Sequence, residues 1–196
     1  MSVLLRVNEI VERPVVTLQG DDVAQVRDVV FVDADGAIAG FTLAKRGLLG
    51  GRMKEVLPWT SVVGLGPDAV MVASEQALTR EPLVTGAVAD DGEGDVLGDR
   101  VVTEGGADVG EVVDVVVEVE GAAARVVGYE MKPSDTFVPA HGRRGRNLFI
   151  PRPDTLAASR QVVIVPDVIV EYVSDELAGF GAAIEGFRAR LREGGS

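Results

Sequence analysis

The sequence contains no cysteine and only one histidine, His141, and both scarcities limit the chemistry that the chain supports. Without cysteine there are no disulfide bonds and no thiolate to act as a nucleophile or metal ligand. A lone histidine has no second imidazole with which to share a metal ion, and it is more often a loop residue than a catalyst. The absence of cysteine also makes the cytoplasm the expected location.

Long hydrophobic runs are absent as well. One of the longest, Val162–Val165, is followed by Pro166 and Asp167, whereas a helix that crosses a bilayer needs about 20 apolar residues. Residues 1–6 lack the length and the small-residue cleavage site of a signal peptide. We therefore expect no transmembrane segment. With 46% hydrophobic residues, the chain of 196 residues is nevertheless able to bury a core.

Basic residues are outnumbered, and this imbalance bears on the partners. The chain has 19 Lys and Arg against 31 Asp and Glu, for a net charge of -12. Such a charge repels phosphate backbones and argues against general nucleic-acid binding. Only 3 of the basic residues are Lys, and together with the many Gly, Ala and Val residues this is typical of a GC-rich prokaryotic genome.

The chain carries an internal repeat with an offset of 86 residues. Residues 23–33 read Val-Ala-Gln-Val-Arg-Asp-Val-Val-Phe-Val-Asp, and residues 109–119 read Val-Gly-Glu-Val-Val-Asp-Val-Val-Val-Glu-Val. Other similar segments keep the same order, with insertions only between them. They are 13–17 with 99–103, 40–43 with 128–131, 57–62 with 150–155, and 70–72 with 163–165. Ordered similarity of this kind predicts one small fold that occurs twice.

The repeated segments have the composition of β-strands, because β-branched and aromatic residues dominate them and turn-forming clusters lie between them. In the third strand of each copy, large residues alternate with small or polar ones. Phe41 and Leu43 in the first copy, and Tyr129 and Met131 in the second, therefore face the predicted core. The pattern predicts a mainly β protein of two tandem, pseudo-symmetric small β-barrels.

The second strand of the first copy is apolar on both faces. Val26, Val30 and Val32 lie on one face, and Val29 and Phe31 lie on the other. Both faces of such a strand are expected to be covered. One face fills the barrel, and the other meets the sister domain, the C-terminal helix or a second chain. A homo-oligomer is therefore left open.

We expect four consecutive regions. The first barrel spans 1–73, a linker spans 74–96, the second barrel spans 97–173, and a helix spans 174–193. The linker begins with residues that favour one helical turn and ends in an acidic, glycine-rich stretch.

The period of the sequence changes near its end. Residues 168–173 predict one last strand, and apolar residues then recur at spacings of three and four. These are Leu177, Phe180, Ile184, Phe187 and Leu191. They predict an amphipathic helix of about five turns, with arginines in its last turns. Three glycines weaken this helix, so we expect it to depend on docking its apolar stripe.

A set of positions shared by the two copies resembles the PRC-barrel domain family. In the first copy these positions are Gly20, Val26, Asp28, Val29, Val30, Gly40, Phe41, Leu43, Leu57, Pro58, Trp59, Ser61 and Val62. In the second copy they are Gly106, Val112, Asp114, Val115, Val116, Gly128, Tyr129, Met131 and Pro151. The second copy departs from the pattern at Arg152, where the first has Trp59. The resemblance covers about 13–73 and 98–166.

This resemblance implies small β-barrels that mediate contacts. The family includes the cytoplasmic domain of the photosynthetic reaction-centre H subunit and the C-terminal domain of a ribosome maturation factor. The sequence shows neither the membrane helix of the first nor the separate N-terminal domain of the second. A ribosome-assembly accessory role is therefore a distant alternative that depends on the resemblance alone.

Two loops are basic in an otherwise acidic chain. The first carries Lys45, Arg46, Arg52 and Lys54; the equivalent loop of the second copy carries Lys132, Arg143, Arg144, Arg146 and Arg152. Because both loops join the same pair of strands, pseudo-symmetry places them at related positions. One hypothesis is a surface that binds an acidic protein segment, a phosphate-bearing ligand or anionic head groups. The alternative is a pair of solvated loops that balance the acidic body.

The remaining candidates do not form a catalytic set. Residues 47–54 contain glycines and a base but lack the Gly-Lys-Ser/Thr ending of a phosphate-binding loop. Asp28 and Asp114 occupy matched positions, and we expect each carboxylate to accept backbone N–H groups at a turn or bulge. Ser61 has no histidine partner in the pattern. We expect no cofactor, no metal and no enzymatic activity.

The sequence therefore predicts a non-catalytic adaptor or scaffold that binds another protein. Its candidate contact surfaces are the second face of the central strand and the helix stripe of Phe180, Ile184 and Phe187. The alternative for both surfaces is packing between the two barrels of one chain. The competing class is a small-molecule or anion-binding regulatory module in which the basic loops shape a pocket.

Overall fold

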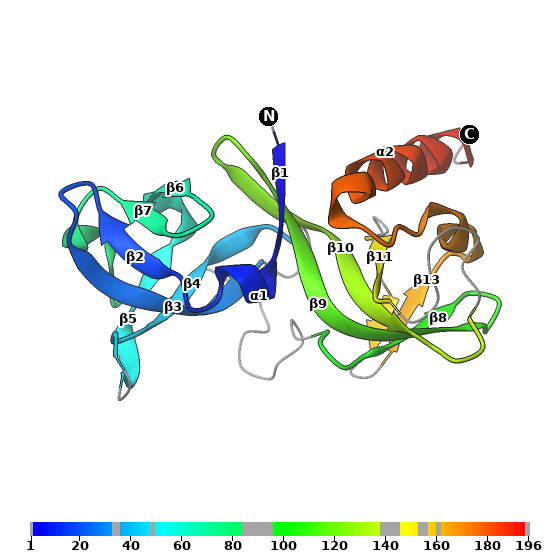
Figure 1. Ribbon diagram of the computed structural model, residues 1–196, viewed down its shortest axis with the longest axis horizontal. Helices are drawn as coiled ribbons and strands as arrows, with labels where there is room; N and C mark the ends of the chain where they lie inside the picture. The colour runs from blue at the N-terminus through cyan, green and yellow to red at the C-terminus, as the bar shows by residue number, and fades with distance from the viewer. Residues whose placement is uncertain are drawn as a thin grey trace. The chain divides into compact units, whose positions relative to one another are not determined.

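A computed structural model describes residues 2–32, 36–47, 50–83, 96–137, 146–152, 157–159 and 162–194, with residues 157–159 and 193–194 described by their backbone alone. The chain divides into two compact units. Unit 1 comprises Leu5–Gly94 with Val119–Arg125, and unit 2 comprises Ser2–Leu4, Asp95–Glu118 and Val126–Ser196. Each unit is built on its own β-sheet (Figure 1). The predicted mainly β architecture of two sheets and a C-terminal helix is confirmed.

The sheet of unit 1 has six strands in the order β5-β4-β3-β2-β7-β6. All neighbours pair antiparallel except β2 and β7, which are parallel. The strands are β2 (Pro14–Thr17), β3 (Asp22–Phe31), β4 (Ile38–Ala44), β5 (Arg52–Pro58), β6 (Val62–Leu65) and β7 (Val70–Val72). The short helices are α1 (Val7–Ile10), η1 (Trp59–Ser61) and η2 (Glu75–Ala77).

The sheet of unit 2 repeats this order as β11-β10-β9-β8-β13-β12, and β1 additionally pairs with β9. The strands are β1 (Ser2–Arg6), β8 (Arg100–Thr103), β9 (Asp108–Glu120), β10 (Ala123–Pro133), β11 (Leu148–Pro151), β12 (Ala157–Ser159) and β13 (Val162–Val165). The helices are η3 (Asp167–Tyr172) and α2 (Leu177–Gly194). Residues 2–4 of β1 belong to unit 2, and the tip of the β9–β10 hairpin belongs to unit 1. The units thus differ at these two places from the consecutive regions expected from the sequence.

The residues that pair across neighbouring strands in unit 1 correspond to those that pair in unit 2, as the internal repeat predicts. Val15 lies opposite Ala24 in unit 1, Val101 lies opposite Gly110 in unit 2, and a bulge follows each pair. The other matched pairs are Gly40–Pro58 with Gly128–Pro151, and Val15–Val70 with Val101–Val163. Two separate segments of sequence therefore form the same fold, down to the position of the bulge.

The same tight turn joins β2 to β3 in unit 1 and β8 to β9 in unit 2. Gly20 has φ 93° and Gly106 has φ 84°, in the left-handed region that glycine adopts without a steric penalty. Their N–H groups donate to the carbonyl oxygens of Thr17 at 2.9 Å and of Thr103 at 2.8 Å. The glycine at this repeated position is therefore required by the turn.

Equivalent residues also fill the two cores. Phe41, Leu43, Tyr129 and Met131 are all buried, as their alternation predicted. Further fully buried pairs include Val15 with Val101, Leu57 with Ile150, Val70 with Val163, and Val72 with Val165. In β9 four successive residues, Asp114–Val117, are buried, so both faces of this strand are covered. The sequence predicted such covering for β3 of the first copy, in which Val26 and Val29 are buried and Val30 and Phe31 are half-buried.

One predicted strand is wrong. Residues 168–173 were expected to extend, but the structure places Asp167–Tyr172 in the 3₁₀ helix η3. A 3₁₀ helix repeats every three residues, so Ile169 and Tyr172 share a side, whereas a strand would place them on opposite faces. Ile169 is fully buried, and the ring of Tyr172 packs edge-on against Phe187, with centroids 5.6 Å apart.

The C-terminal helix α2 forms as the apolar period predicted. Its residues Phe180 and Ile184 form a buried cluster with Val116, Val127 and Phe149 of the sheet. The N–H of Glu176 donates to the Ser174 hydroxyl at 3.3 Å, just before the helix begins. No helix within the described ranges is both long and apolar enough to span a bilayer.

Candidate functional site

The four basic residues of the first loop lie at one end of the β4–β5 hairpin. Arg52 pairs with Ala44 across the hairpin, and the N–H of Lys45 donates to the carbonyl of Gly51 at 3.0 Å. Lys45, Arg46, Arg52 and Lys54 are all exposed. Arg46 forms an ion pair with Asp22 at the start of β3, so part of the positive charge is balanced within unit 1.

The second basic loop is described only in part. Arg146 is exposed and precedes β11, whereas Arg143, Arg144 and His141 lie outside the described residues. The anion-facing surface that the sequence suggested is therefore described in full in unit 1 and only in part in unit 2.

The apolar stripe of α2 is buried within unit 2. Phe180, Ile184 and Phe187 are 0%, 3% and 1% exposed. The rings of Phe180 and Phe149 lie 5.6 Å apart, and Phe187 packs on Tyr172. The stripe expected to be a contact surface is thus covered by the sheet and by η3, and these three residues are not available to a partner in this structure.

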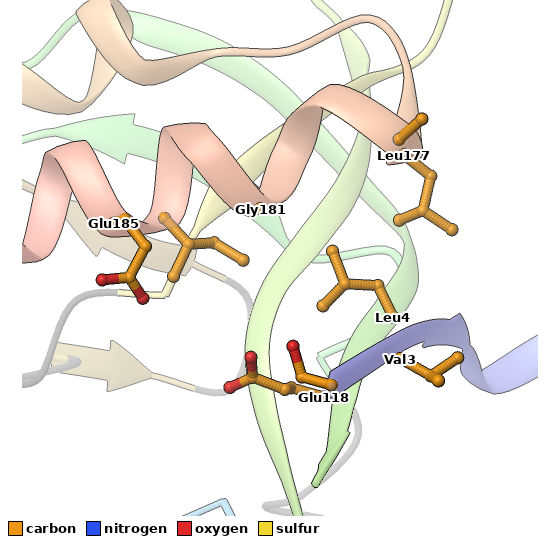
Figure 2. A pocket seen from close by; sticks show the side chains of 9 residues that line it. Val3, Leu4, Glu118, Leu177, Gly181 and Glu185 are labelled. Carbon is orange, nitrogen blue, oxygen red and sulfur yellow. The ribbon is translucent and has the colours of Figure 1, made fainter.

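A groove lies beside this helix, within unit 2. It has a volume of about 600 Å³ and runs between β1, the end of β9 and α2. Figure 2 shows the side chains of Leu4 and Leu177 pointing toward one another across it. Its lining residues are Ser2, Val3 and Leu4 of β1, Glu118 of β9, and Leu177, Ala178, Gly181, Ile184 and Glu185 of α2.

The groove has apolar walls and an acidic edge. Val3 is 53% exposed, and Leu4 and Leu177 are half-buried. Glu118 and Glu185 supply the two carboxylates. The guanidinium of Arg188 lies 3.1 Å from the Glu185 carboxylate and 3.9 Å from that of Glu118, but Arg188 does not line the groove.

Gly181 keeps the groove open. A Cβ atom built on Gly181 would meet no other atom within 4 Å, so the space next to the helix backbone is empty of protein. Because Gly181 lines the groove, a larger side chain at this position would take up space within it.

The carboxylates that the sequence singled out have structural roles. The N–H of Val29 donates to the Asp28 carboxylate at 2.8 Å, and the N–H of Val115 donates to the Asp114 carboxylate at the same distance. Asp28 lies where the register of β3 shifts, as expected for a group that satisfies a bulge. Within the described residues, no group of three or more His, Cys, Asp or Glu side chains is placed to hold a metal ion.

The sequence did not predict the groove. Leu177 and Ile184 were recognised as helix residues, but nothing in the pattern linked residues 2–4 to β9. The only available signal was the apolar run Val3-Leu-Leu5, which is too short to reveal a pairing partner.

The fold defines a class of protein made of two β units that share one six-strand order, with β1 added as a seventh strand to the sheet of unit 2. Residues 3–78 match the family model of the PRC-barrel domain, which assigns this part of the chain to that family. The match spans the strands of unit 1, and unit 2 repeats their order and register. No curated protein matches the chain.

Proposed function

We propose that the protein is a non-catalytic, cytoplasmic scaffold that binds another protein through the groove of unit 2. The observation that carries this proposal is an open groove with apolar walls on a framework of packed strands and one helix. Such walls lose contact with water when a partner side chain enters, and this burial favours binding by about 25 cal/mol per Å² of apolar surface.

The chemistry of the groove supports binding rather than catalysis. Its polar side chains are Ser2, Glu118 and Glu185, and the single histidine of the chain is not among the lining residues. Without a base beside it, the hydroxyl of Ser2 is not activated as a nucleophile. The carboxylates of Glu118 and Glu185 both form ion pairs with Arg188. The PRC-barrel resemblance to domains that mediate contacts points in the same direction.

Comparative capture tests this function. The wild-type chain and the variants Gly181→Leu and Ala182→Leu, each tagged at the C-terminus, are used as bait in a lysate of the native host, and bound proteins are quantified by mass spectrometry. Gly181→Leu fills the groove, whereas Ala182 is exposed and lies outside it. We expect one protein to be captured by wild type and Ala182→Leu and to be depleted at least ten-fold with Gly181→Leu. Equal capture by all three would contradict the proposal, and ribosomal proteins in the lost fraction would favour a ribosome-assembly role.

A second candidate function is anion binding at the β4–β5 hairpin. It is favoured by one observation, the four exposed bases Lys45, Arg46, Arg52 and Lys54 in a chain of net charge -12. The matching candidates in the sequence of the second copy are Arg143, Arg144 and Arg146.

A further inference from the structure

We propose that the groove binds its partner by strand addition: an extended segment of the partner pairs with the free edge of β1 and places alternate side chains between β1 and α2. This inference rests on the proposed function and names its binding mode. Its occupant is an extended segment with apolar residues at every second position and at least one Lys or Arg.

The backbone of β1 provides the first argument. β1 pairs with β9, and no second strand pairs with it within the described parts of the chain. An edge strand presents unpaired N–H and C=O groups that act as a template for another strand, and proteins commonly block such edges with proline, lysine or inward charges. β1 ends in the charged residue Arg6, whose N–H donates to the Glu9 carboxylate at 3.1 Å, but residues Ser2–Leu5 contain none of these blocking features, and Val3 is more than half exposed.

The position of α2 beside this edge provides the second argument. Figure 2 shows β1 running below the helix, with Leu4 pointing up toward it and Leu177 facing down. In an added strand, side chains alternate between two faces, so every second residue would enter the space next to Gly181. The apolar surfaces of Leu4 and Leu177 favour aliphatic side chains at those positions.

Charge provides the third argument. Two carboxylates, Glu118 and Glu185, line the groove, and the one guanidinium that contacts both is outside it. The net charge of -12 adds a long-range attraction for cations. A Lys or Arg of the partner is therefore favoured at the end of the groove where these carboxylates lie, and an acidic residue there is disfavoured.

The test uses capped peptides as probes. The first has the sequence Thr-Val-Lys-Val-Thr-Val-Lys-Thr, and the second has both lysines replaced by glutamate. Two further versions of the first carry N-methyl groups on alternate amides, one on the odd and one on the even positions. Binding is measured by fluorescence anisotropy, and amide hydrogen exchange of residues 2–6 is followed by NMR. The full chain, Gly181→Leu and Ala182→Leu are compared, with circular dichroism to show that each variant is folded.

We expect the lysine peptide to bind wild type and Ala182→Leu at least ten-fold more tightly than the glutamate peptide, and Gly181→Leu to bind neither. Only one of the N-methylated versions should lose binding, because only alternate amides face β1. Exchange should slow at alternate residues of β1 when the peptide binds.

Three outcomes would overturn strand addition. They are binding that is insensitive to N-methylation in both versions, unchanged exchange in β1 at saturating peptide, and no binding of any peptide. If the partner captured from the host is still lost with Gly181→Leu, the scaffold function stands and only the binding mode is wrong. A concentration-dependent dimer that Gly181→Leu abolishes would instead identify a second copy of the chain as the occupant.

Discussion

Phe180 lies directly over Gly128: a Cβ atom built on Gly128 would come within 2.3 Å of Cζ of Phe180. The aromatic ring therefore occupies the space that any other residue at position 128 would need. Unit 1 has the same arrangement, since a Cβ on Gly40 would come within 2.7 Å of Cδ2 of Leu83. In each copy the chain that follows the sheet places an apolar side chain on the glycine of the third strand.

The segments that lead to these contacts also match. Thr79 forms an isolated bridge with Val56 of β5, and Ser174 forms one with Phe149 of β11. Each bridge follows a 3₁₀ helix, η2 in unit 1 and η3 in unit 2. The docking of α2 is thus an extension of a connection that both copies share.

We expect Gly128→Ala to lower the free energy of unfolding by about 2–3 kcal/mol, because the new methyl group collides with Phe180 and with the carbonyl oxygen of Ile150 at 2.4 Å. Urea denaturation followed by circular dichroism measures this. Gly181→Ala serves as the control, because the new Cβ atom meets no other atom within 4 Å. This substitution replaces a helical glycine and should therefore raise the free energy of unfolding by up to about 1 kcal/mol. In a double-mutant cycle, Phe180→Ala should cost less in the Gly128→Ala background. Strictly additive effects would show that the ring and the glycine are not in contact.

Glu12 is expected to be a strained residue that glycine improves. It has φ 71°, whereas the equivalent position of unit 2, Gly98, has φ 84°. The backbone bonds at the two positions match: the N–H of Glu12 donates to Val26 and that of Gly98 donates to Val112. Because a side chain in the left-handed region costs roughly 1 kcal/mol, Glu12→Gly should raise the stability of unit 1 by about that amount.

The fluorescence of the single tryptophan, Trp59, reports the unfolding of unit 1, because its Nε1–H donates to the Ala122 carbonyl at 2.8 Å and its ring lies 6.1 Å from Phe41. Glu12→Ala, which keeps the strain, is the control and should change the midpoint little. A loss of stability in Glu12→Gly would contradict the interpretation.

Asp167 links stability to pH. Its pKa is lowered from the ordinary value, first by the hydrogen bond from the Thr103 hydroxyl and then by that from the N–H of Gly105 at 3.0 Å. A carboxyl group with a lower pKa in the folded state stabilises the fold above its unfolded pKa of about 3.9, and this contribution is lost as the pH falls through the folded value. Asp167→Asn should therefore be less stable than wild type at pH 7, and the difference should shrink below pH of about 4. Denaturation curves between pH 2 and 7 measure this, and a difference that is constant with pH would rule out the linkage.

The basic hairpin predicts a response to polyvalent anions. If it binds phosphate groups, tripolyphosphate should raise the Tm of wild type by a few degrees, since about 100-fold excess over Kd adds ~2.7 kcal/mol. Arg52→Glu combined with Lys54→Glu should remove the shift. Arg190→Glu, which changes an exposed base of α2, is the control for net charge and should keep it. An equal shift in all three proteins would show that the anion acts elsewhere.

Much of the fold could be predicted from the sequence because the same pattern of residues occurs in two copies. Alternation at Phe41 and Leu43, and again at Tyr129 and Met131, identified the core face, and all four side chains are buried. A single copy would have been more ambiguous, since short valine runs fit a buried strand or a helix.

The failures have a physical cause. The strand expected at 168–173 was inferred from β-branched residues, but Ile169 is buried through a threefold period that composition does not reveal. The stripe that contains Phe187 was expected to meet either a partner or the other barrel, because the pattern identifies an apolar surface but does not state what covers it. The pairing of β1 with β9 joins residues far apart in the chain, so local propensity carries no information about it, and the groove depends on that pairing.

The most direct test of the scaffold proposal is the affinity of the captured partner for the wild-type chain, Gly181→Leu and Ala182→Leu, measured by isothermal titration calorimetry with purified proteins. The proposal predicts that Gly181→Leu weakens binding at least 30-fold, about 2 kcal/mol, while Ala182→Leu changes it less than two-fold. Equal affinity for the three proteins would contradict the proposal that the partner occupies the groove between β1 and α2.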